Sequence, residues 1–390
     1  MKTLIELYDE RPIENVVTGE VFRAEKVVYV CDREIAADRK LQSRLKQYFS
    51  ARGVTAELSF VETDMLSTDA IMKTLNDILS VHEDCVLDVA GGTDAALFAC
   101  GAVCAGREIP VLTYSRKRNR FYNIRNAEFA QDLPCEMKLT IRDCFLMAGG
   151  DMRTGRVDNN VLASYSDLFE GFFRLYIAHR REWVSIVNYI QTVSQPGKNE
   201  KTSLSVSGGR TVKAGRGKVT ADMAALKDME KLGLIRQLNE EGDRIRFRFM
   251  DMQVRTWLRD IGSVLELYIY KLCLDAGVYD DVRTSVVVDW EGKKQPDGVT
   301  NEIDVMASCG IRPVFISCKT CDVKTEALNE LAILRDRFGS GIARAAIVST
   351  GGRGKNVMRN RAQELGIEVI ELGDLTGGKA KERLRRLATE

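Results

Sequence analysis

Residues 262–320 read GSVLELYIYKLCLDAGVYDDVRTSVVVDWEGKKQPDGVTNEIDVMASCGIRPVFISCKT. The stretch opens with a segment that is apolar on nearly every helical face, which is typical of a buried helix. It closes with two strand-like runs, NEIDVMA and PVFISCKT, which the turn CGIR separates. This order predicts a buried helix followed by a sheet, and we expect the upstream chain to control that unit.

Charged residues interrupt this apolar stretch. Glu266 lies in the helix, Asp304 in the first strand-like run and Lys319 in the second. Because a buried carboxylate without a partner costs free energy, we expect Glu266 to meet a cation or a hydrogen-bond network. Strict alternation of side chains along both runs predicts one polar row on the sheet. Its members are Glu302, Asp304, Ser317 and Lys319, while Ile303, Val305 and Ala307 face the other way.

An acid on an opening helix, an Asp on one strand and a Lys on the next are typical of a metal-dependent phosphodiesterase site. Carboxylates bind Mg²⁺ or Mn²⁺ through oxygen, and the metal activates water and stabilises charge on the phosphate. The lysine orients or deprotonates the water, or neutralises the phosphate. The structural alternative is a buried Asp304–Lys319 ion pair, with Glu266 paired to an arginine.

The composition narrows the class of protein. A chain of 390 residues predicts two or three domains. The net charge of +1 gives no global basic field, so any nucleic-acid site must be a local patch. Ten scattered cysteines and two histidines that form no Cys/His cluster argue against a zinc site or disulfides, and they fit reduced thiols in the cytoplasm. No run has the pattern of a signal peptide or the length of a membrane helix.

Strands and helices alternate through residues 1–150, which predicts a parallel sheet with helices on both faces. The expected strands cover residues 1–8, 26–32, 55–63, 84–90 and 110–115, and the expected helices cover residues 33–52, 68–79 and 95–106.

The sequence Gly91-Gly92-Thr93-Asp94 joins a strand to a helix. Glycines let a ligand approach the backbone, and a helix N-terminus favours an anion. Because ligands bind at the carboxyl ends of parallel strands, this loop and the loop at Asp32 are expected to line one mouth. The expected contacts are Cys31, Asp32, Arg33, Ala90, Gly91, Gly92, Thr93 and Asp94. The alternative is a tight turn without a ligand.

Residues 151–250 differ in character from the first part. Helices are expected over residues 166–178, 181–193 and 223–232, with a Gly-, Ser- and Lys-rich loop or hairpin at 195–216 and a hairpin at 234–249. A helix followed by a hairpin is the second half of a winged helix, which can contact DNA. We favour a connecting or dimer-forming role, because Asp228 and Glu230 offset Lys227 and Lys231 on the helix.

The final part, residues 251–390, is predicted to have the order α-β-β-β-α-β, extended at its end. A helix is expected over residues 254–276, then strands at 282–290, 302–307 and 313–318, a helix at 325–338, a strand at 344–349, a helix at 356–365 and a strand at 367–372.

The pattern NEIDV…PVFISCKT, preceded by GSxxExYxY, resembles the PD-(D/E)xK restriction-endonuclease-like nucleases. Together with DVAGGTDAA near the N-terminus, it is similar to CRISPR-ancillary nucleases that carry a CRISPR-associated Rossmann fold (CARF) sensor. The resemblance covers essentially the whole chain. It implies an α/β protein with a Rossmann-like CARF domain (1–150), a linker with a winged-helix-like segment (151–250) and a restriction-endonuclease-like nuclease domain (251–390).

The resemblance also implies a homodimer that binds a cyclic oligoadenylate, with cyclic tetra-adenylate as the expected ring. Binding would activate metal-dependent cleavage of single-stranded DNA, RNA or both, or nicking of duplex DNA. By matching position, Glu266, Asp304 and Lys319 are catalytic. Glu266, Asp304 and the carbonyl of Cys318 are the expected ligands of Mn²⁺ or Mg²⁺.

The chain departs from the family pattern at two places. Ser317 stands where the second acid of (D/E)xK is usual, so either Glu302 supplies the missing charge or activity is reduced or absent. Asp94 follows Gly-Gly-Thr where a lysine is common. Two other functions therefore stay open: a non-catalytic, ligand-gated winged-helix transcription regulator, and a constitutive nuclease with a purely structural N-terminal domain.

Overall fold

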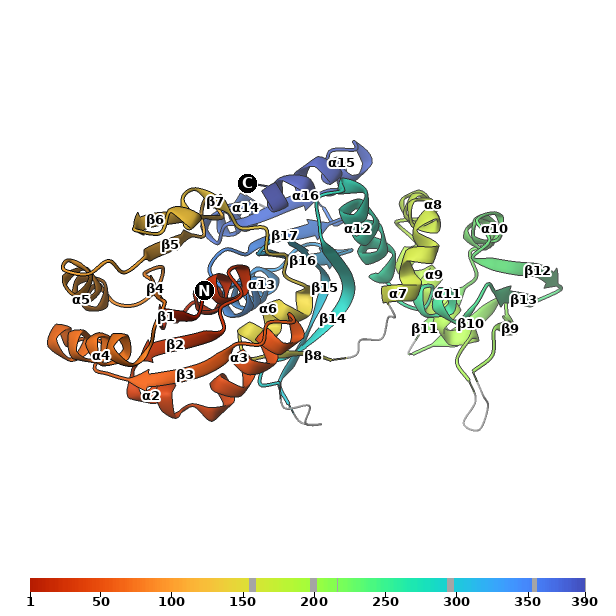
Figure 1. Ribbon diagram of the computed structural model, residues 1–390. Helices are drawn as coiled ribbons and strands as arrows, with labels where there is room; N and C mark the ends of the chain where they lie inside the picture. The colour runs from red at the N-terminus through yellow and green to blue at the C-terminus, as the bar shows by residue number, and fades with distance from the viewer. Residues whose placement is uncertain (154–158, 197–201, 216, 293–297, 353–355, 390) are drawn as a thin grey trace.

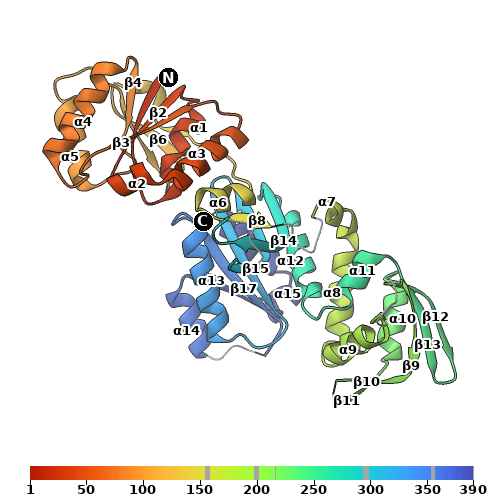
Figure 2. The same ribbon diagram turned by 90° about the horizontal axis from the view of Figure 1, so that it is seen from below.

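The computed structural model describes residues 1–153, 159–196, 202–215, 217–292, 298–352 and 356–389 (Figure 1). It contains a seven-stranded sheet near the N-terminus, a six-stranded sheet near the C-terminus and a smaller middle region. In both views the middle region lies beyond α12, on the side away from the N-terminal sheet (Figures 1 and 2).

The N-terminal sheet has the strand order β3-β2-β1-β4-β5-β6-β7. The strands from β3 to β5 are parallel, as predicted, while β6 and β7 run antiparallel to their neighbours. This order places β1 and β4 side by side at the centre. The strands are β1 (Thr3–Leu7), β2 (Lys26–Cys31), β3 (Glu57–Glu62), β4 (Cys85–Asp88), β5 (Val111–Ser115), β6 (Arg120–Arg125) and β7 (Leu133–Pro134).

Helices cover both faces of this sheet, as predicted. Apolar residues of α4 and α5 pack on one face, and those of α1 and α3 pack on the other. The bounds are η1 (Pro12–Asn15), α1 (Val17–Val21), α2 (Arg33–Ala37), α3 (Arg39–Ala51), α4 (Thr68–Val81), α5 (Asp94–Cys104) and η2 (Glu128–Ala130).

The single helix expected over residues 33–52 is wrong, because α2 and α3 are separate. The Asp38 carboxylate accepts hydrogen bonds from the backbone N–H groups of Lys40 (2.9 Å) and Leu41 (3.0 Å). An aspartate in this position caps the start of a new helix, so the chain breaks there.

The C-terminal sheet has the order β18-β17-β16-β15-β14-β8. β14, β15 and β16 are antiparallel, and β16, β17 and β18 are parallel. The elements are α6 (Ile141–Met147), β8 (Asp151–Arg153), α12 (Ser263–Ala276), β14 (Asp281–Asp289), β15 (Thr300–Cys309), β16 (Arg312–Lys319), α13 (Thr325–Phe338), β17 (Arg344–Ser349), α14 (Asn356–Glu364), β18 (Ile367–Glu371), α15 (Leu372–Thr376) and α16 (Ala380–Thr389).

α12 and α16 cover one face of this sheet, and α6, α13 and α14 cover the other. The expected division at residue 150 falls between α6 and β8, and both elements pack with the C-terminal sheet. Apolar residues of the N-terminal sheet, α6 and α13 form one continuous cluster. The two sheets are therefore joined by a shared core.

The middle region contains a three-stranded sheet, β12-β13-β9, and a hairpin, β10-β11. Its elements are α7 (Asn159–Leu162), η3 (Ala163–Tyr165), α8 (Ser166–Ala178), α9 (Trp183–Val193), β9 (Ser205–Gly209), β10 (Thr211–Ala214), β11 (Gly217–Thr220), α10 (Met223–Lys231), β12 (Ile235–Glu241), β13 (Arg244–Phe249) and α11 (Met252–Trp257). The predicted helix and hairpin at 223–249 are both present.

The helix expected over residues 254–276 is also divided, into α11 and α12. Between them, the Asp260 carboxylate accepts hydrogen bonds from the backbone N–H groups of Gly262 (2.8 Å) and Ser263 (2.7 Å). On α12, Tyr268 stacks on Phe173 of α8, with ring centroids 3.9 Å apart. This contact fixes α12 against the middle region.

All ten cysteines are free thiols, and nine of them are buried or half-buried. Within the described ranges, no helix combines the length and the apolarity that a membrane crossing needs.

Candidate active site and sensor cavity

The predicted catalytic residues converge where α12 begins and β16 ends. Glu266 lies in the first turn of α12, Asp304 lies in β15 and Lys319 is the last residue of β16. The antiparallel pairing of β15 with β16 brings residues 13 to 15 positions apart in sequence into contact. The structure therefore assembles the three residues from three elements.

Asp304 accepts hydrogen bonds from three consecutive residues of β16. Its Oδ2 accepts hydrogen bonds from the Ser317 hydroxyl (3.1 Å), the Cys318 backbone N–H (2.6 Å) and the Lys319 ammonium (3.3 Å). Hydrogen bonds to the ionised form stabilise a carboxylate. The position of the missing acid is thus occupied by a hydroxyl that donates to Asp304.

The polar row differs from the prediction, because alternation along β15 is not strict. Ile303 and Met306 lie in the core cluster shared with the N-terminal sheet, whereas Val305 and Ala307 lie in the cluster beneath α12. The expectation that Ile303, Val305 and Ala307 share a face is therefore wrong. The break lies opposite Ser285 of β14, whose φ is +52°. A left-handed backbone at a non-glycine residue distorts the regular pleat.

Glu302 is exposed, and it is not one of the residues that share a hydrogen bond with Asp304. Its charge nevertheless acts on the site, because it contributes to the raised pKa of Glu266.

Glu266 has neither an ion pair nor a hydrogen bond to its carboxylate among the described residues, so the expected partner is not found there. Burial, followed by the charges of Asp304, Asp260 and Glu302, raises the pKa of Glu266 to about 8, and Lys319 only partly opposes this rise. One carboxylate oxygen lies close to Gly262, where an added Cβ would come within 3.0 Å of it. The structural alternative is thus met only in its Asp304–Lys319 ion pair.

Lys319 keeps its charge despite being half-buried. Burial acts to lower its pKa, but the charge and hydrogen bond of Asp304, followed by Cys318 and Glu266, raise the pKa above its ordinary value. At neutral pH the side chain is therefore a cation that touches Asp304.

The carboxylates of Glu266 and Asp304 would suit a divalent cation that takes few ligands from the protein. Across the described residues, no group of three or more His, Cys, Asp or Glu side chains is placed to hold a metal. Two carboxylates, Glu266 and Asp304, are close enough for one to raise the pKa of the other. Mg²⁺ commonly takes one or two carboxylates together with water and substrate phosphates. A cation would also offset the burial and the carboxylate charges that raise the pKa of Glu266.

Residues beyond the sequence prediction connect the site to the middle region. The Thr350 backbone N–H donates to the Lys319 carbonyl (3.0 Å), the Arg180 guanidinium donates to the Thr350 carbonyl (2.7 Å), and the hydroxyls of Tyr176 and Thr350 share a hydrogen bond (2.5 Å). Thr350 directly follows β17, the parallel neighbour of β16. Because the end of β17 lies beside the end of β16, this position could have been recognised from the predicted strands. No sequence pattern indicated a role for Tyr176 or Arg180 at the site.

A cavity of about 460 Å³ opens at the carboxyl ends of β1, β2 and β4. Of the predicted ligand contacts, Cys31, Asp32, Gly92 and Thr93 line it. Arg33 borders a neighbouring pocket instead, together with Asp32. Ala90, Gly91 and Asp94 lie outside the lining, and the Ala90 N–H donates to the buried Asp88 carboxylate (2.7 Å).

The two glycines permit close contact between β4 and β1. A Cβ on Gly91 would lie 2.7 Å from the Leu7 carbonyl oxygen, and one on Gly92 would lie 2.8 Å from the Leu7 Cβ. Gly92 also has a φ of +89°. Thr93 caps α5 through the Ala96 N–H (3.2 Å). The motif therefore packs the loop onto the central strand and leaves the start of α5 at the cavity.

The loop after β1, residues 8–11, was missed and lines the same cavity. Arg11 forms two hydrogen bonds to Asp9 (2.6 and 2.7 Å). Burial acts to raise the pKa of Asp9, but Arg11 and the Gly92 N–H together hold it below its ordinary value. The signal was the polar sequence YDER directly after a strand, and the position of β1 at the sheet centre makes that strand end decisive.

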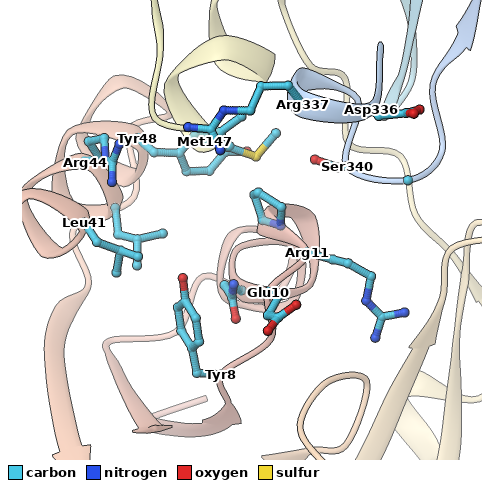
Figure 3. Close-up of a pocket in the computed structure, with 15 residues that line it drawn as sticks. Tyr8, Glu10, Arg11, Leu41, Arg44, Tyr48, Met147, Asp336, Arg337 and Ser340 are labelled. Atoms are coloured by element: carbon cyan, nitrogen blue, oxygen red, sulfur yellow. The ribbon is translucent and has the colours of Figure 1, made fainter. Parts of the chain in front are cut away.

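A second cavity, of about 360 Å³, lies between the two sheets (Figure 3). Tyr8, Glu10 and Arg11 line it on one side, and Arg337 and Ser340, at the end of α13, line it on the other. The loop at residues 8–11 thus borders both cavities. Nearby, Arg116 of the N-terminal region donates to the Ser340 carbonyl (3.0 Å) and pairs with Glu14 (2.5 Å).

Comparison with known proteins bears on both halves of the chain. Residues 253–389 match the family "Card1-like, endonuclease domain". No curated protein sequence matches the chain. Protein VC1899 from Vibrio cholerae has a similar structure, with a TM-score of 0.75, 16% identity and coverage of 100% of this chain and 99% of that one.

Can2 from Sulfobacillus thermosulfidooxidans, solved in complex with cyclic tetra-adenylate, is similar with a TM-score of 0.70 and 14% identity. The similarity covers 99% of this chain and 98% of that chain. The α/β fold class that the resemblance implied is confirmed. The C-terminal region is therefore similar in sequence to Card1-like endonuclease domains, and the whole chain shares the fold of VC1899 and Can2.

Proposed function

We propose that the protein is a cyclic-oligoadenylate-activated, metal-dependent nuclease of type III CRISPR antiviral defence. The observation that carries this proposal is the contact of Lys319 with Asp304 beside Glu266, a buried carboxyl with a raised pKa that has no hydrogen-bond partner among the described residues. The match of residues 253–389 to an endonuclease family supports it. Single-stranded DNA, RNA or both are the proposed substrates, with nicking of duplex DNA as a further activity.

Glu266, Asp304 and the Cys318 carbonyl would hold Mn²⁺ or Mg²⁺, and the metal would supply water activation and charge stabilisation at the phosphate. Ser317 contributes a hydroxyl that keeps Asp304 in place, since it donates to Asp304 Oδ2. A hydroxyl adds no negative charge to the site. The affinity for metal therefore depends on the deprotonation of Glu266.

Lys319 acts as a cation rather than as a base in this proposal. Its raised pKa keeps the ammonium charged at neutral pH, so it cannot accept a proton from water. Its three donors can orient a water molecule and neutralise a phosphate oxygen. Thr350, which Tyr176 and Arg180 hold, fixes the backbone from which Lys319 projects.

The activator would bind at the cavity formed by the loops after β1, β2 and β4. The N-terminus of α5 at Thr93 and the guanidinium of Arg11 suit an anionic ring nucleotide. The complex of Can2 with cyclic tetra-adenylate supports this ring as the ligand. We further propose a homodimer that binds one ring across paired sensor domains, in the cytoplasm.

The loop at residues 8–11 offers a route from ligand to active site. It lines the sensor cavity and the cavity between the two sheets, so a shift of this loop changes the contacts of the α13 end (Figure 3). α13 packs on β16 and β17, the strands whose ends carry Lys319 and Thr350. Ligand binding would thereby bias the position of the catalytic lysine.

The test is cleavage of labelled single strands with Mn²⁺, with and without cyclic tetra-adenylate. The wild-type chain is expected to cleave only with the ligand, and Lys319→Ala is expected to lose at least about 100-fold in rate. Lys324→Ala, an exposed lysine in the next loop, is the matched control. Equal cleavage without the ligand would support the constitutive nuclease instead, and no cleavage in either condition would contradict the proposal.

The transcription-regulator alternative rests on Ser317 and on the winged-helix-like segment. A gel shift with duplex DNA separates the two functions, because a regulator would bind in a ligand-dependent manner whether or not Lys319 is present. Helix α10 does not favour recognition, since Asp228 on this helix engages His179 (3.0 Å) and Lys231 (2.9 Å).

A further inference from the structure

The three-stranded sheet of the middle region has one covered face and one exposed face. Along β13, side chains alternate strictly between the core and solvent. Ile245, Phe247 and Phe249 are buried, whereas Arg244, Arg246 and Arg248 are exposed. We call the exposed side, made of these three arginines with Arg236 and Ser205, the arginine face.

Like charges stand directly opposite each other on this face and on the neighbouring hairpin. In the antiparallel register Arg236 pairs with Arg248, and Lys213 of β10 pairs with Lys218 of β11. All four side chains are exposed. Like charges directly opposite are destabilising, because their Cβ atoms lie only about 5 Å apart. Two such pairs in one small region indicate an anionic partner.

Carboxylates of the chain do not neutralise these pairs. Within the described ranges, Arg236, Lys213 and Lys218 have no acidic side chain at ion-pair distance. Arg248 donates to the Ser205 hydroxyl (3.2 Å), and Arg246 has Glu241 at 3.4 Å. The face therefore keeps a net positive charge and offers hydroxyl and guanidinium donors, the groups that contact phosphates in nucleic-acid complexes.

The face lacks the apolar anchors of a protein interface. None of the exposed large hydrophobic residues in the described chain falls between positions 205 and 249. Protein interfaces use aromatic and aliphatic residues at their centres, whereas contacts with a nucleic-acid backbone are mainly charged and polar. The composition therefore favours a nucleic acid over an acidic protein.

The middle region is fixed to the catalytic end of the nuclease sheet. The Trp183 indole of α9 donates to the Ile261 carbonyl (3.3 Å), just before α12, and Arg180 holds Thr350 beside Lys319. Both views place the middle region against α12 (Figures 1 and 2). A strand bound on the middle region would thus be held by a part of the chain that packs directly against the elements of the candidate catalytic residues.

We propose that the arginine face and the lysine pair of β10-β11 bind the sugar-phosphate backbone of a nucleic acid. That this nucleic acid is the substrate rests on the proposed nuclease function; the binding itself does not. The contact is made by the sheet and not by α10, whose acidic residues oppose it. It carries no base recognition, because backbone contacts fix position rather than sequence.

The test measures binding without cleavage, with full-length Lys319→Ala protein in EDTA and a fluorescent single-stranded oligonucleotide. The change is Arg236→Gln with Arg248→Gln. The slope of log affinity against log salt should fall by about 1.4, at about 0.7 per lost phosphate contact, with an affinity loss on the order of tenfold. Lys46→Gln with Lys117→Gln removes the same charge from exposed positions of the sensor region, and it should leave both quantities unchanged.

Thermal unfolding separates binding from structure. Because the paired arginines repel each other, their neutralisation should leave the unfolding midpoint unchanged or raise it while binding weakens. Unchanged binding, or weaker binding with a lower midpoint, would overturn the proposal. So would equal affinity for poly-glutamate, which would assign the face to an acidic protein. Intact binding by the Lys319→Ala protein, together with no cleavage by the wild type in the presence of Mn²⁺ and the ring nucleotide, would contradict the nuclease function alone.

Discussion

Glu266→Gln is expected to stabilise the metal-free protein while it removes nuclease activity. In the folded chain, burial and the charges of Asp304, Asp260 and Glu302 raise the pKa of Glu266 from 4.5 to about 8. The charged carboxylate is therefore disfavoured in the folded state. A neutral amide of nearly the same shape removes this cost, but it cannot bind a metal as a carboxylate does.

The magnitude follows from the shift of the pKa. One pKa unit corresponds to about 1.4 kcal/mol, so the rise from 4.5 to about 8 sets an upper limit of about 5 kcal/mol for the destabilisation by the charged form. Water entry and relaxation around buried charges reduce such costs, and we expect a measured gain of about 2 kcal/mol.

The sign of the pH dependence is fixed, because the folded pKa lies above the unfolded one. The folded state binds a proton at Glu266 more tightly than the unfolded state does. The stabilisation that results is fully present below about pH 4.5. It is lost progressively as the pH rises, and it levels off above about pH 8. The advantage of Glu266→Gln over the wild type should therefore grow through this window.

The assay is calorimetric unfolding in chelator between about pH 5 and pH 9. The wild type, Glu266→Gln and the matched variant Glu302→Gln are compared. Glu266→Gln should flatten the pH dependence, whereas Glu302→Gln should reduce it only slightly, because Glu302 is a minor cause of the raised pKa of Glu266. Addition of Mn²⁺ near pH 7 should stabilise the wild type and release about one proton, because the metal requires the ionised carboxylate. The Glu266→Gln variant should show neither effect.

A destabilisation by Glu266→Gln that does not vary with pH would contradict the raised pKa of Glu266. If Glu266→Gln destabilised the protein by the same amount at every pH, Glu266 would be ionised and paired in the folded state. A metal would then not be needed to explain its position. Loss of activity by itself does not distinguish these cases, because both predict it.

Three further changes test the site and the sensor. Ser317→Asp should destabilise the metal-free protein, because it brings a second carboxylate next to Asp304, and it should tighten Mn²⁺ binding by at least about tenfold in titration calorimetry; unchanged affinity would place this side chain outside the metal site. Gly92→Ala should cost about 1–3 kcal/mol and abolish activation by the ring nucleotide, because its φ is +89° and its Cβ would press on β1. Gly106→Ala, with open space around it, is the control, and equal melting curves for the two would contradict the strain. Asp38→Ala should lower the free energy of unfolding in urea by about 1 kcal/mol, because α3 loses its cap. Asp69→Ala is the comparison, since Asp69 is exposed and is not the capping residue of its helix; a smaller effect at Asp38 than at Asp69 would contradict the capping role.

Much of the candidate active site could be predicted from residue type and spacing. A lysine and an aspartate on two apolar strands joined by a short turn must meet if the strands pair, and they do, at 3.3 Å. The outcome for Glu266 could not be predicted. Whether a buried acid is paired or protonated depends on which side chains from distant elements surround it, and α12 brings it near three other carboxylates rather than near an arginine.

The sensor mouth shows the same division. The loops after β2 and β4 could be recognised because each follows a buried strand and one carries Gly-Gly-Thr. The loop after β1 was missed, although it lines two cavities. Its importance depends on the strand order, which puts β1 between β2 and β4. The helix breaks at Asp38 and Asp260 were missed because an aspartate that accepts hydrogen bonds from nearby backbone N–H groups looks like any polar residue until those bonds are seen.

Strands β6, β7 and β8 were not predicted. The residue pattern alone did predict the α/β class, strands β1 to β5 and β14 to β18, and the candidate site residues Glu266, Asp304 and Lys319. These follow from local periodicity and from charges placed in apolar runs. Four features depend on the tertiary structure: the break in the polar row at β15, the raised pKa of Glu266, the hydrogen bonds of Tyr176 and Arg180 to Thr350, and the pairing of like charges on the arginine face. The physical reason is that burial, register and electrostatic environment are properties of contacts between distant segments, which local pattern does not specify.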